Sequence, residues 1–307
     1  LVVLVVFQIL FLLAYAWARR RQQATAWLAG STGVLAVVAF GFAFAWLDYA
    51  GIGRAPVWIF AAALSADLCL LTLAVGESRW AKLHLFAGAV AFLLLAIWTG
   101  NYISDALLPW ALGATLGFAT LHTAFPLVLQ RLRPHAAPVW WGHLFPPVAL
   151  LLVLLPIVQL PAVSLLVWPV VLLVDVLAIG LAVITGSLLA LVAVLVLTLV
   201  ATGCWLMQLP VVGVPDVGLA PVALIGGFAV LFFAVGAWAV RRWLGRVATL
   251  GAEAAAEETG AQAAWLPHLP AMAAALPFLL LIMVVLRLPQ TSLSPVFGLA
   301  LLLVGLL

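Results

Sequence analysis

The chain has 307 residues, of which 68% are hydrophobic and 7% are charged, and its formal net charge is +3. Soluble domains are about 45–50% apolar and about 25% charged, so this composition excludes a water-soluble globular protein. With a mean hydropathy of +1.35, the chain is predicted to be an all-α, polytopic transmembrane protein. A net charge this small gives no indication of a nucleic-acid partner.

A membrane-spanning helix needs about 20 mainly apolar residues, because each residue rises about 1.5 Å through a hydrocarbon core of about 30 Å. The apolar runs lack the alternation of a β-barrel, which favours helices. The run at 144–158 contains Pro146, Pro147 and Pro156, which neighbouring helices can accommodate. We predict eleven spans: 1–17, 26–47, 55–75, 80–99, 106–129, 144–158, 163–184, 187–207, 219–240, 271–286 and 295–307.

The chain begins at Leu1 and ends at Leu307 inside apolar runs, and it has no initiator methionine. A signal peptide carries its basic residues before its apolar core, whereas Arg19, Arg20 and Arg21 follow the first run. We therefore expect a segment of a longer protein, in which the first and last spans are truncated.

The basic residues predict the orientation. Only Arg54 and Arg287 follow even-numbered spans. The other ten of the twelve follow odd-numbered spans: Arg19, Arg20, Arg21, Arg79, Lys82, Arg131, Arg133, Arg241, Arg242 and Arg246. Basic loops face the cytoplasm, so span 1 is predicted to enter from outside.

Tryptophan is the second topological marker. Aromatic belts lie at the two membrane–water interfaces, so tryptophans near span ends are expected there. Nine fit this pattern: Trp17, Trp27, Trp46, Trp58, Trp80, Trp98, Trp110, Trp140 and Trp141.

Segments about 110 residues apart resemble one another, which predicts an internal repeat. DLCLLTLAV at 67–75 resembles DVLAIGLAV at 175–183, and LGFATLHTAFPLVLQR at 116–131 resembles IGGFAVLFFAVGAWAVRR at 225–242. A unit of four helices explains these offsets, and an even number of spans makes the repeat parallel.

The repeat divides the chain into four parts. Residues 1–25, with span 1, would end a preceding unit. Residues 26–142 (spans 2–5) and 143–266 (spans 6–9) would be two complete units. Residues 267–307, with spans 10 and 11, would begin a truncated third unit.

Two aspartates, Asp67 and Asp175, each lie about twelve residues into a predicted span, about 18 Å deep and near the midplane. A carboxylate at that depth is costly unless it is paired, hydrated or protonated. One interpretation is a proton relay or polar pathway at two equivalent places. The other is a structural acid that ties helices together through Ser65, Thr72 or a residue on another helix.

His122 lies deep in the fifth span beside Thr123, and its counterpart in the second repeat is near Phe232. It is interpreted either as a satisfied structural group or as a proton carrier in the same intramembrane pathway. Three further histidines lie toward predicted cytoplasmic ends and are expected at the interface, where an imidazole can reach water: His84, His143 and His268.

Small residues recur four apart in the last helix of each repeat, at Gly113 and Gly117 and again at Ala223 and Gly227. This spacing lets helix backbones approach closely. It predicts general helix packing, with self-association through these faces as the alternative. Elsewhere, the basic and aromatic segment RLRPHAAPVWWGH at 131–143 could meet anionic lipid headgroups.

Motifs for catalysis are missing from the sequence. It has no phosphate-binding glycine loop, no HExxH, no paired cysteines with metal spacing and no cluster of nucleophile and base. We therefore predict no catalytic residues, no cofactor and no metal site, which makes an enzyme the least favoured of the possible functions.

Two regions resemble the bacterial family called domain of unknown function 2339, a group of large predicted membrane proteins. They are LLPWALGATLGFATLHTAFPLVLQR at 107–131 and PHLPAMAAALPFLLLIMVVLRLP, at 267–289, followed by SPVFGLALLL at 294–303. The resemblance implies a longer, many-span inner-membrane protein with a more polar N-terminal region. It supplies no catalytic motif.

Three functions are compatible with these features. The first is a scaffold or assembly component of a cell-envelope membrane complex, whose partners are membrane lipids and other membrane subunits or a second copy. The alternative is a transporter of a lipid-linked or hydrophobic solute that uses Asp67 and Asp175. The weakest is a membrane enzyme.

Overall fold

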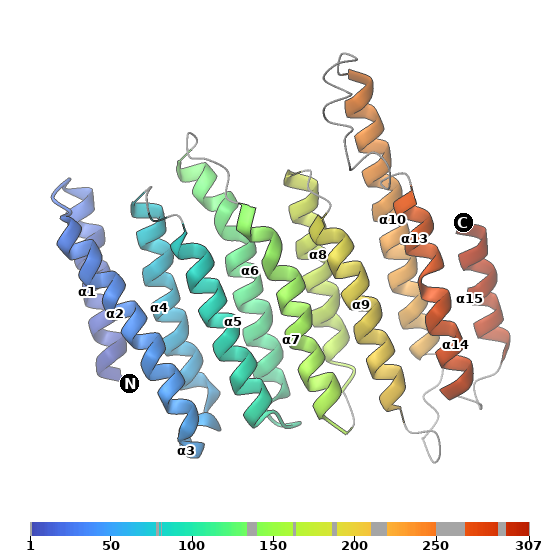
Figure 1. Cartoon of the computed structure of the whole chain (residues 1–307), viewed down its shortest axis with the longest axis horizontal. Helices are drawn as coiled ribbons and strands as arrows, with labels where there is room; N and C mark the ends of the chain where they lie inside the picture. Colours follow the sequence, from blue (N-terminus) through green and yellow to red (C-terminus); the bar gives the residue numbers. More distant parts are fainter. Residues whose placement is uncertain are drawn as a thin grey trace. The chain divides into compact units, whose positions relative to one another are not determined.

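The computed structural model describes residues 2–77, 80, 82–133, 140–161, 164–185, 189–209, 220–249, 268–287 and 293–306. Within these ranges the chain is helical, with no strand (Figure 1). Nine of the described helices are long and apolar enough to cross a membrane. They are α1 (Val2–Arg20), α2 (Ala26–Ala45), α4 (Pro56–Gly76), α5 (Leu83–Tyr102), α6 (Leu108–Leu132), α7 (Phe145–Gln159, extended by η3, Trp140–Leu144), α8 (Val167–Thr185), α9 (Leu189–Gln208) and α10 (Ala220–Thr249).

The other helices of the described chain are shorter. They are η1 (Trp46–Asp48), α3 (Ala50–Gly53), α13 (Leu269–Ala275), α14 (Pro277–Arg287) and α15 (Leu293–Leu306). The run expected to be one span at 271–286 is therefore interrupted at Leu276. Pro277 explains the break, because proline lacks an N–H and its ring crowds the preceding turn.

Proline does not prevent α7. Pro146 and Pro147 fall in its first turn, where a backbone N–H has no partner within the helix, and Pro156 lies inside it. The span expected at 144–158 thus forms a helix, and each of the other eight among the first nine expected spans contains one long helix.

The chain divides into two compact units, Leu1–Leu181 and Ala182–Leu307. In the second unit, α10 packs against α13, α14 and α15, and α9 packs against α14. Glycine permits one of these approaches: a Cβ on Gly226 would lie 3.0 Å from Leu299 Cδ1.

In the first unit α4 is the central helix, in contact with α1, α2, α5 and α6. Side chains from several directions therefore meet on α4. The Ser65 hydroxyl contacts Gln8 Oε1 of α1 and also donates to the Ala62 carbonyl at 2.8 Å. Thr72 donates to the Leu68 carbonyl at 2.7 Å.

The C-terminal end of α5 holds the connection between α2 and α4. Trp98 Nε1 donates to the Gly53 carbonyl at 2.7 Å, and the Tyr102 hydroxyl contacts the Leu47 carbonyl. Trp98 is fully buried, so its expected place in a lipid-facing aromatic belt is wrong. The indole lies inside the protein, where its N–H donates to a carbonyl of the short helix α3.

Candidate functional site

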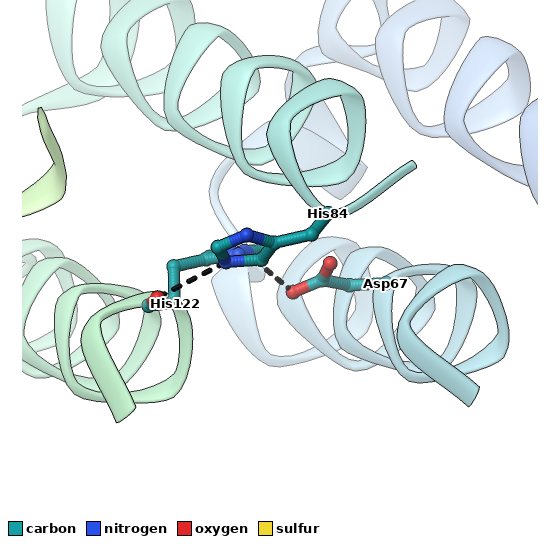
Figure 2. Close-up of polar contacts among 3 residues, drawn as sticks. All are labelled: Asp67, His84 and His122. Atoms are coloured by element: carbon teal, nitrogen blue, oxygen red, sulfur yellow. Dashed lines mark hydrogen bonds and ion pairs between the residues drawn. The ribbon is translucent and has the colours of Figure 1, made fainter. Parts of the chain in front are cut away.

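A cluster of buried polar side chains in the described part of the first unit joins α4, α5 and α6 (Figure 2). Asp67 of α4 and His122 of α6 approach to 3.0 Å between Oδ2 and Nε2, and both side chains are fully buried. This is the distance of an ion pair, although the angles are not those of a hydrogen bond. Asp67 thus contacts another helix, while the expected alternatives Ser65 and Thr72 bond elsewhere.

The pairing has a simple geometric basis. Asp67 lies nine residues before Gly76, where α4 ends, and His122 lies ten before Leu132, where α6 ends. At about 1.5 Å per residue, both lie about 14–15 Å from the ends of their helices. Because α4 and α6 are separated by one intervening spanning helix, they run in the same direction, which brings the two side chains to one level.

His84 of α5 is the third member of the cluster, and sequence reasoning missed it. Its Nε2 donates to the His122 carbonyl at 3.0 Å. This carbonyl lies four residues before Pro126, which stays inside α6 and has no N–H to donate. The His84 side chain therefore supplies the hydrogen bond that the proline removes from α6.

The expectation that His84 reaches water is wrong, since its side chain is fully buried. Its ring lies 4.6 Å from that of Phe125 and 5.2 Å from that of Phe145, measured between centroids. The sequence signal that could have identified its role is HTAFP at 122–126, which leaves a carbonyl without a helical donor. His143 is partly buried, and His268 is exposed.

Aromatic side chains enclose the cluster. The Phe145 ring lies 4.7 Å from that of His122, and Phe92 stacks on Phe145 with centroids 5.7 Å apart. A glycine makes this possible: a Cβ on Gly88 would overlap the Phe145 ring and would lie 3.1 Å from His122 Nδ1. Gly88 thus lets α5 approach the ring that covers the pair.

The Asp67–His122 pair is enclosed by the protein, and part of the hydrogen-bonding capacity of the cluster is unused. Asp67 Oδ1, His84 Nδ1 and His122 Nδ1 have no hydrogen-bond partner among the described residues. Hydrogen bonds to other described residues therefore do not draw the Asp67 and His122 side chains away from each other. The contact between Asp67 and His122 links α4 to α6.

Asp175 of α8 is fully buried as well. In the predicted alignment of the two repeats, Phe232 of α10 stands at the position of His122. If the repeat is correct, the second copy has no histidine at the position that pairs with Asp67.

The small residues lie on the surface. A Cβ on Gly113 or Gly117 would have no neighbour within 4 Å, and the same holds for Gly227. Ala223 is also exposed. Packing within the chain, the simpler of the two expectations, does not account for Gly113 and Gly117.

An apolar groove of about 410 Å³ runs past these two glycines between α4 and α6. It is lined by Phe60, Leu64, Pro109, Trp110, Gly113, Ala114, Gly117 and Phe118. Among the described residues, no group of three or more His, Cys, Asp or Glu side chains is arranged to hold a metal ion.

No protein-family model, curated protein or solved structure matches this chain. The resemblance to the family of unknown function therefore stays a prediction. What can be inferred about function rests on the cluster and the groove.

Proposed function

We propose that this protein is a scaffold or assembly component of a membrane complex. The observation that carries the proposal is the contrast on α6, where His122 is sealed against Asp67 while Gly113 and Gly117 face outward along a groove. The buried polar groups stabilise the chain itself. The small-residue face stays open to another protein.

The structural role of the acid is supported by its surroundings. Asp67 and His122 are fully buried, and phenylalanine rings pack over the imidazole. Breaking such a pair by removing one partner leaves an uncompensated buried charge. The same contact therefore favours one arrangement of α4 and α6, which a scaffold requires.

The groove is suited to a transmembrane helix of another subunit. Helices associate in lipid mainly by close packing, and glycines four apart allow the two backbones to approach. Phe60 and Leu64 on one wall and Trp110 and Phe118 on the other offer apolar contact to a helix seated there.

Cysteine cross-linking in native membranes tests this proposal. We would introduce Gly117→Cys into a chain whose Cys69 and Cys204 are replaced by alanine, and treat intact membranes with a short bifunctional thiol reagent. Gly117 should give one adduct of defined mass, and its protein content should include a second membrane subunit.

Gly100→Cys is the matched control, since Gly100 is an exposed glycine of the neighbouring helix α5 with no atom within 4 Å of its Cβ position. It should give no defined adduct. If Gly117→Cys gives no adduct, or the two positions behave alike, the groove is not an assembly surface.

A proton-coupled transporter is the second candidate, favoured by the Asp67–His122 contact at 3.0 Å. Dicyclohexylcarbodiimide, which labels protonated carboxyls that it reaches through lipid, separates the two functions. A structural acid stays unlabelled. Labelling of Asp67 that changes with pH and is prevented by a solute would instead support transport.

The finer topology belongs to the same proposal. We propose eleven spans arranged as parallel four-helix repeats, with the basic ends in the cytoplasm of a bacterium and the chain in its inner membrane. The distribution of arginine supports this orientation. Thiol labelling from each side should modify a cysteine at Arg54 from outside and one at Arg131 from inside; the reverse pattern would exclude it.

A further inference from the structure

Two arginines from different helices converge on the C-terminal end of α4. Arg133, directly after α6, donates through Nη2 to the Gly76 carbonyl. Arg19 of α1 donates through Nη1 to the buried Tyr15 hydroxyl at 3.3 Å. A Cβ on Gly76 would overlap both Arg19 Nη1 and the Tyr15 hydroxyl. The two guanidinium groups therefore meet around one glycine.

These hydrogen bonds use only a small part of the available donors. Each guanidinium carries five N–H groups, and one contact is described for each arginine at this end of α4. The carboxylate of Glu77, the residue after Gly76, lies near the Tyr15 hydroxyl. In the described part of the chain, no ion pair joins Arg19 or Arg133 to a carboxylate.

The site also lies where apolar helices end. Arg19 is in the last turn of α1, and Gly76 is the last residue of α4. Trp17 is 57% exposed, and the Arg21 guanidinium lies 4.9 Å from the centre of its ring. Tryptophan beside arginine at a helix end is typical of the headgroup region of a membrane.

We propose that Arg19 and Arg133 bind the phosphate of an anionic phospholipid at the end of α4. Arginine pairs with phosphate through two parallel N–H donors, and two arginines from separate helices can hold one phosphate between them. The lipid is favoured over a free phosphate ion because the acyl chains would lie along the exposed apolar side chains of α1, among them Leu10 and Leu13. A bound lipid would join α1, α4 and α6 at this end.

The alternative is that Arg133 only caps α4, since a cation near the last carbonyls of a helix is favourable by itself. Glutamine distinguishes the two, because it keeps a hydrogen-bond donor but removes the charge. The test variant is R19Q/R133Q. The control is R20Q/R131Q, which removes the same charge from exposed positions of the same two helices.

The full chain in detergent would be titrated with phosphatidylglycerol and, separately, with phosphatidylcholine, and bound lipid counted by native mass spectrometry. We expect wild type and R20Q/R131Q to retain one phosphatidylglycerol. R19Q/R133Q should bind it at least about tenfold more weakly, since each basic residue near a membrane surface contributes about 1 kcal/mol.

Three results would overturn the proposal: equal losses in the two double variants, no loss in R19Q/R133Q, or equal retention of phosphatidylcholine. Displacement of the lipid by millimolar inorganic phosphate would assign the site to a soluble anion instead. If R19Q/R133Q does not fold, R19Q alone keeps the Arg133 contact with α4 and should still weaken binding about fivefold. R19K/R133K, which keeps both charges, should bind phosphatidylglycerol better than R19Q/R133Q or R19Q does.

Discussion

Helices α4 and α6 meet at two levels, and the two levels differ. Toward their C-terminal ends, Asp67 and His122 pair at 3.0 Å beneath phenylalanine rings. Toward their N-terminal ends, the same helices leave a groove of about 410 Å³ beside Gly113 and Gly117. One level is closed by complementary polar and aromatic side chains, and the other is left open beside two glycines.

This difference separates what stabilises the chain from what it offers to a partner. In lipid there is no hydrophobic driving force between helices, so close packing and internal polar contacts hold them together. The closed level has both kinds of contact. At the open level α4 and α6 leave a groove beside two exposed glycines. Changes at those glycines should affect association and leave the fold intact.

The largest expected effect is at the Asp67–His122 pair. Asp67→Ala should destabilise the protein by about 3–5 kcal/mol, because it leaves the imidazole buried without its partner. His122→Ala should cost about as much, and D67A/H122A should cost less than the sum of the two. Reversible unfolding in mixed micelles gives the free energy of unfolding of wild type and of the three variants.

The control for this cycle is Thr72→Ala, which lies on the same helix and bonds only within it. Its effect should be under about 1 kcal/mol and should add to that of His122→Ala. Additive effects of D67A and H122A would mean that the two side chains do not interact, and the closed level would lose its electrostatic basis.

The next effect concerns the carbonyl that Pro126 leaves without a donor. His84→Phe keeps an aromatic ring but removes the N–H that reaches the His122 carbonyl at 3.0 Å. The unpaired buried carbonyl should cost about 1–3 kcal/mol. Pro126→Ala restores a backbone N–H at the residue four positions on, so H84F/P126A should be more stable than H84F.

That rescue is specific to the proposed bond. In a chain that retains His84, Pro126→Ala supplies a second donor to a carbonyl already satisfied, and should gain less than it does beside His84→Phe. Equal gains in the two backgrounds would show that the proline acts only through helix propensity.

A third effect of similar or smaller size tests how closely α5 approaches the cluster. Gly88→Ala should destabilise by about 1–3 kcal/mol, since its Cβ would overlap Phe145 and force the ring to move. Gly100→Ala in the same helix meets no atom within 4 Å, and should be neutral or stabilising by up to about 1 kcal/mol. If thermal unfolding gives the same shift for both, Phe145 does not seal the site.

The sequence was sufficient for the nine long helices in the described part of the chain, because lipid imposes a length and an apolar composition that can be counted. The interruption at Leu276 was missed, since Pro277 lies inside a run as apolar as the others. Pro126 and Pro156 remain inside helices. Composition therefore does not separate a proline that breaks a helix from one that a neighbour accommodates.

The candidate site could be predicted only in part. Asp67 and His122 were identified as intramembrane polar residues because polarity at that depth is costly. Their contact depends on which helices pack against each other, and the periodicity of the sequence does not predict helix neighbours. His84 was placed at the interface by counting from the predicted end of its span, whereas its burial follows from the aromatic rings and the carbonyl that surround it.

The smallest effect on stability, and the clearest separation of the two levels, is expected at the groove. Gly117→Ala places a methyl group where no atom lies within 4 Å. Helix propensity then predicts stabilisation by up to about 1 kcal/mol in the isolated chain.

Gly117→Leu should also leave thermal unfolding in detergent nearly unchanged. In native membranes, however, its bulk should displace a helix packed against Gly117, so the proportion of the chain that migrates as a complex in native electrophoresis should fall. Gly100→Leu, on an exposed position of α5, controls for bulk on the lipid-facing surface and should migrate as wild type does. An unfolding shift as large as that of Gly88→Ala would show that the groove closes within the chain, and the distinction between the two levels of α4 and α6 would fail.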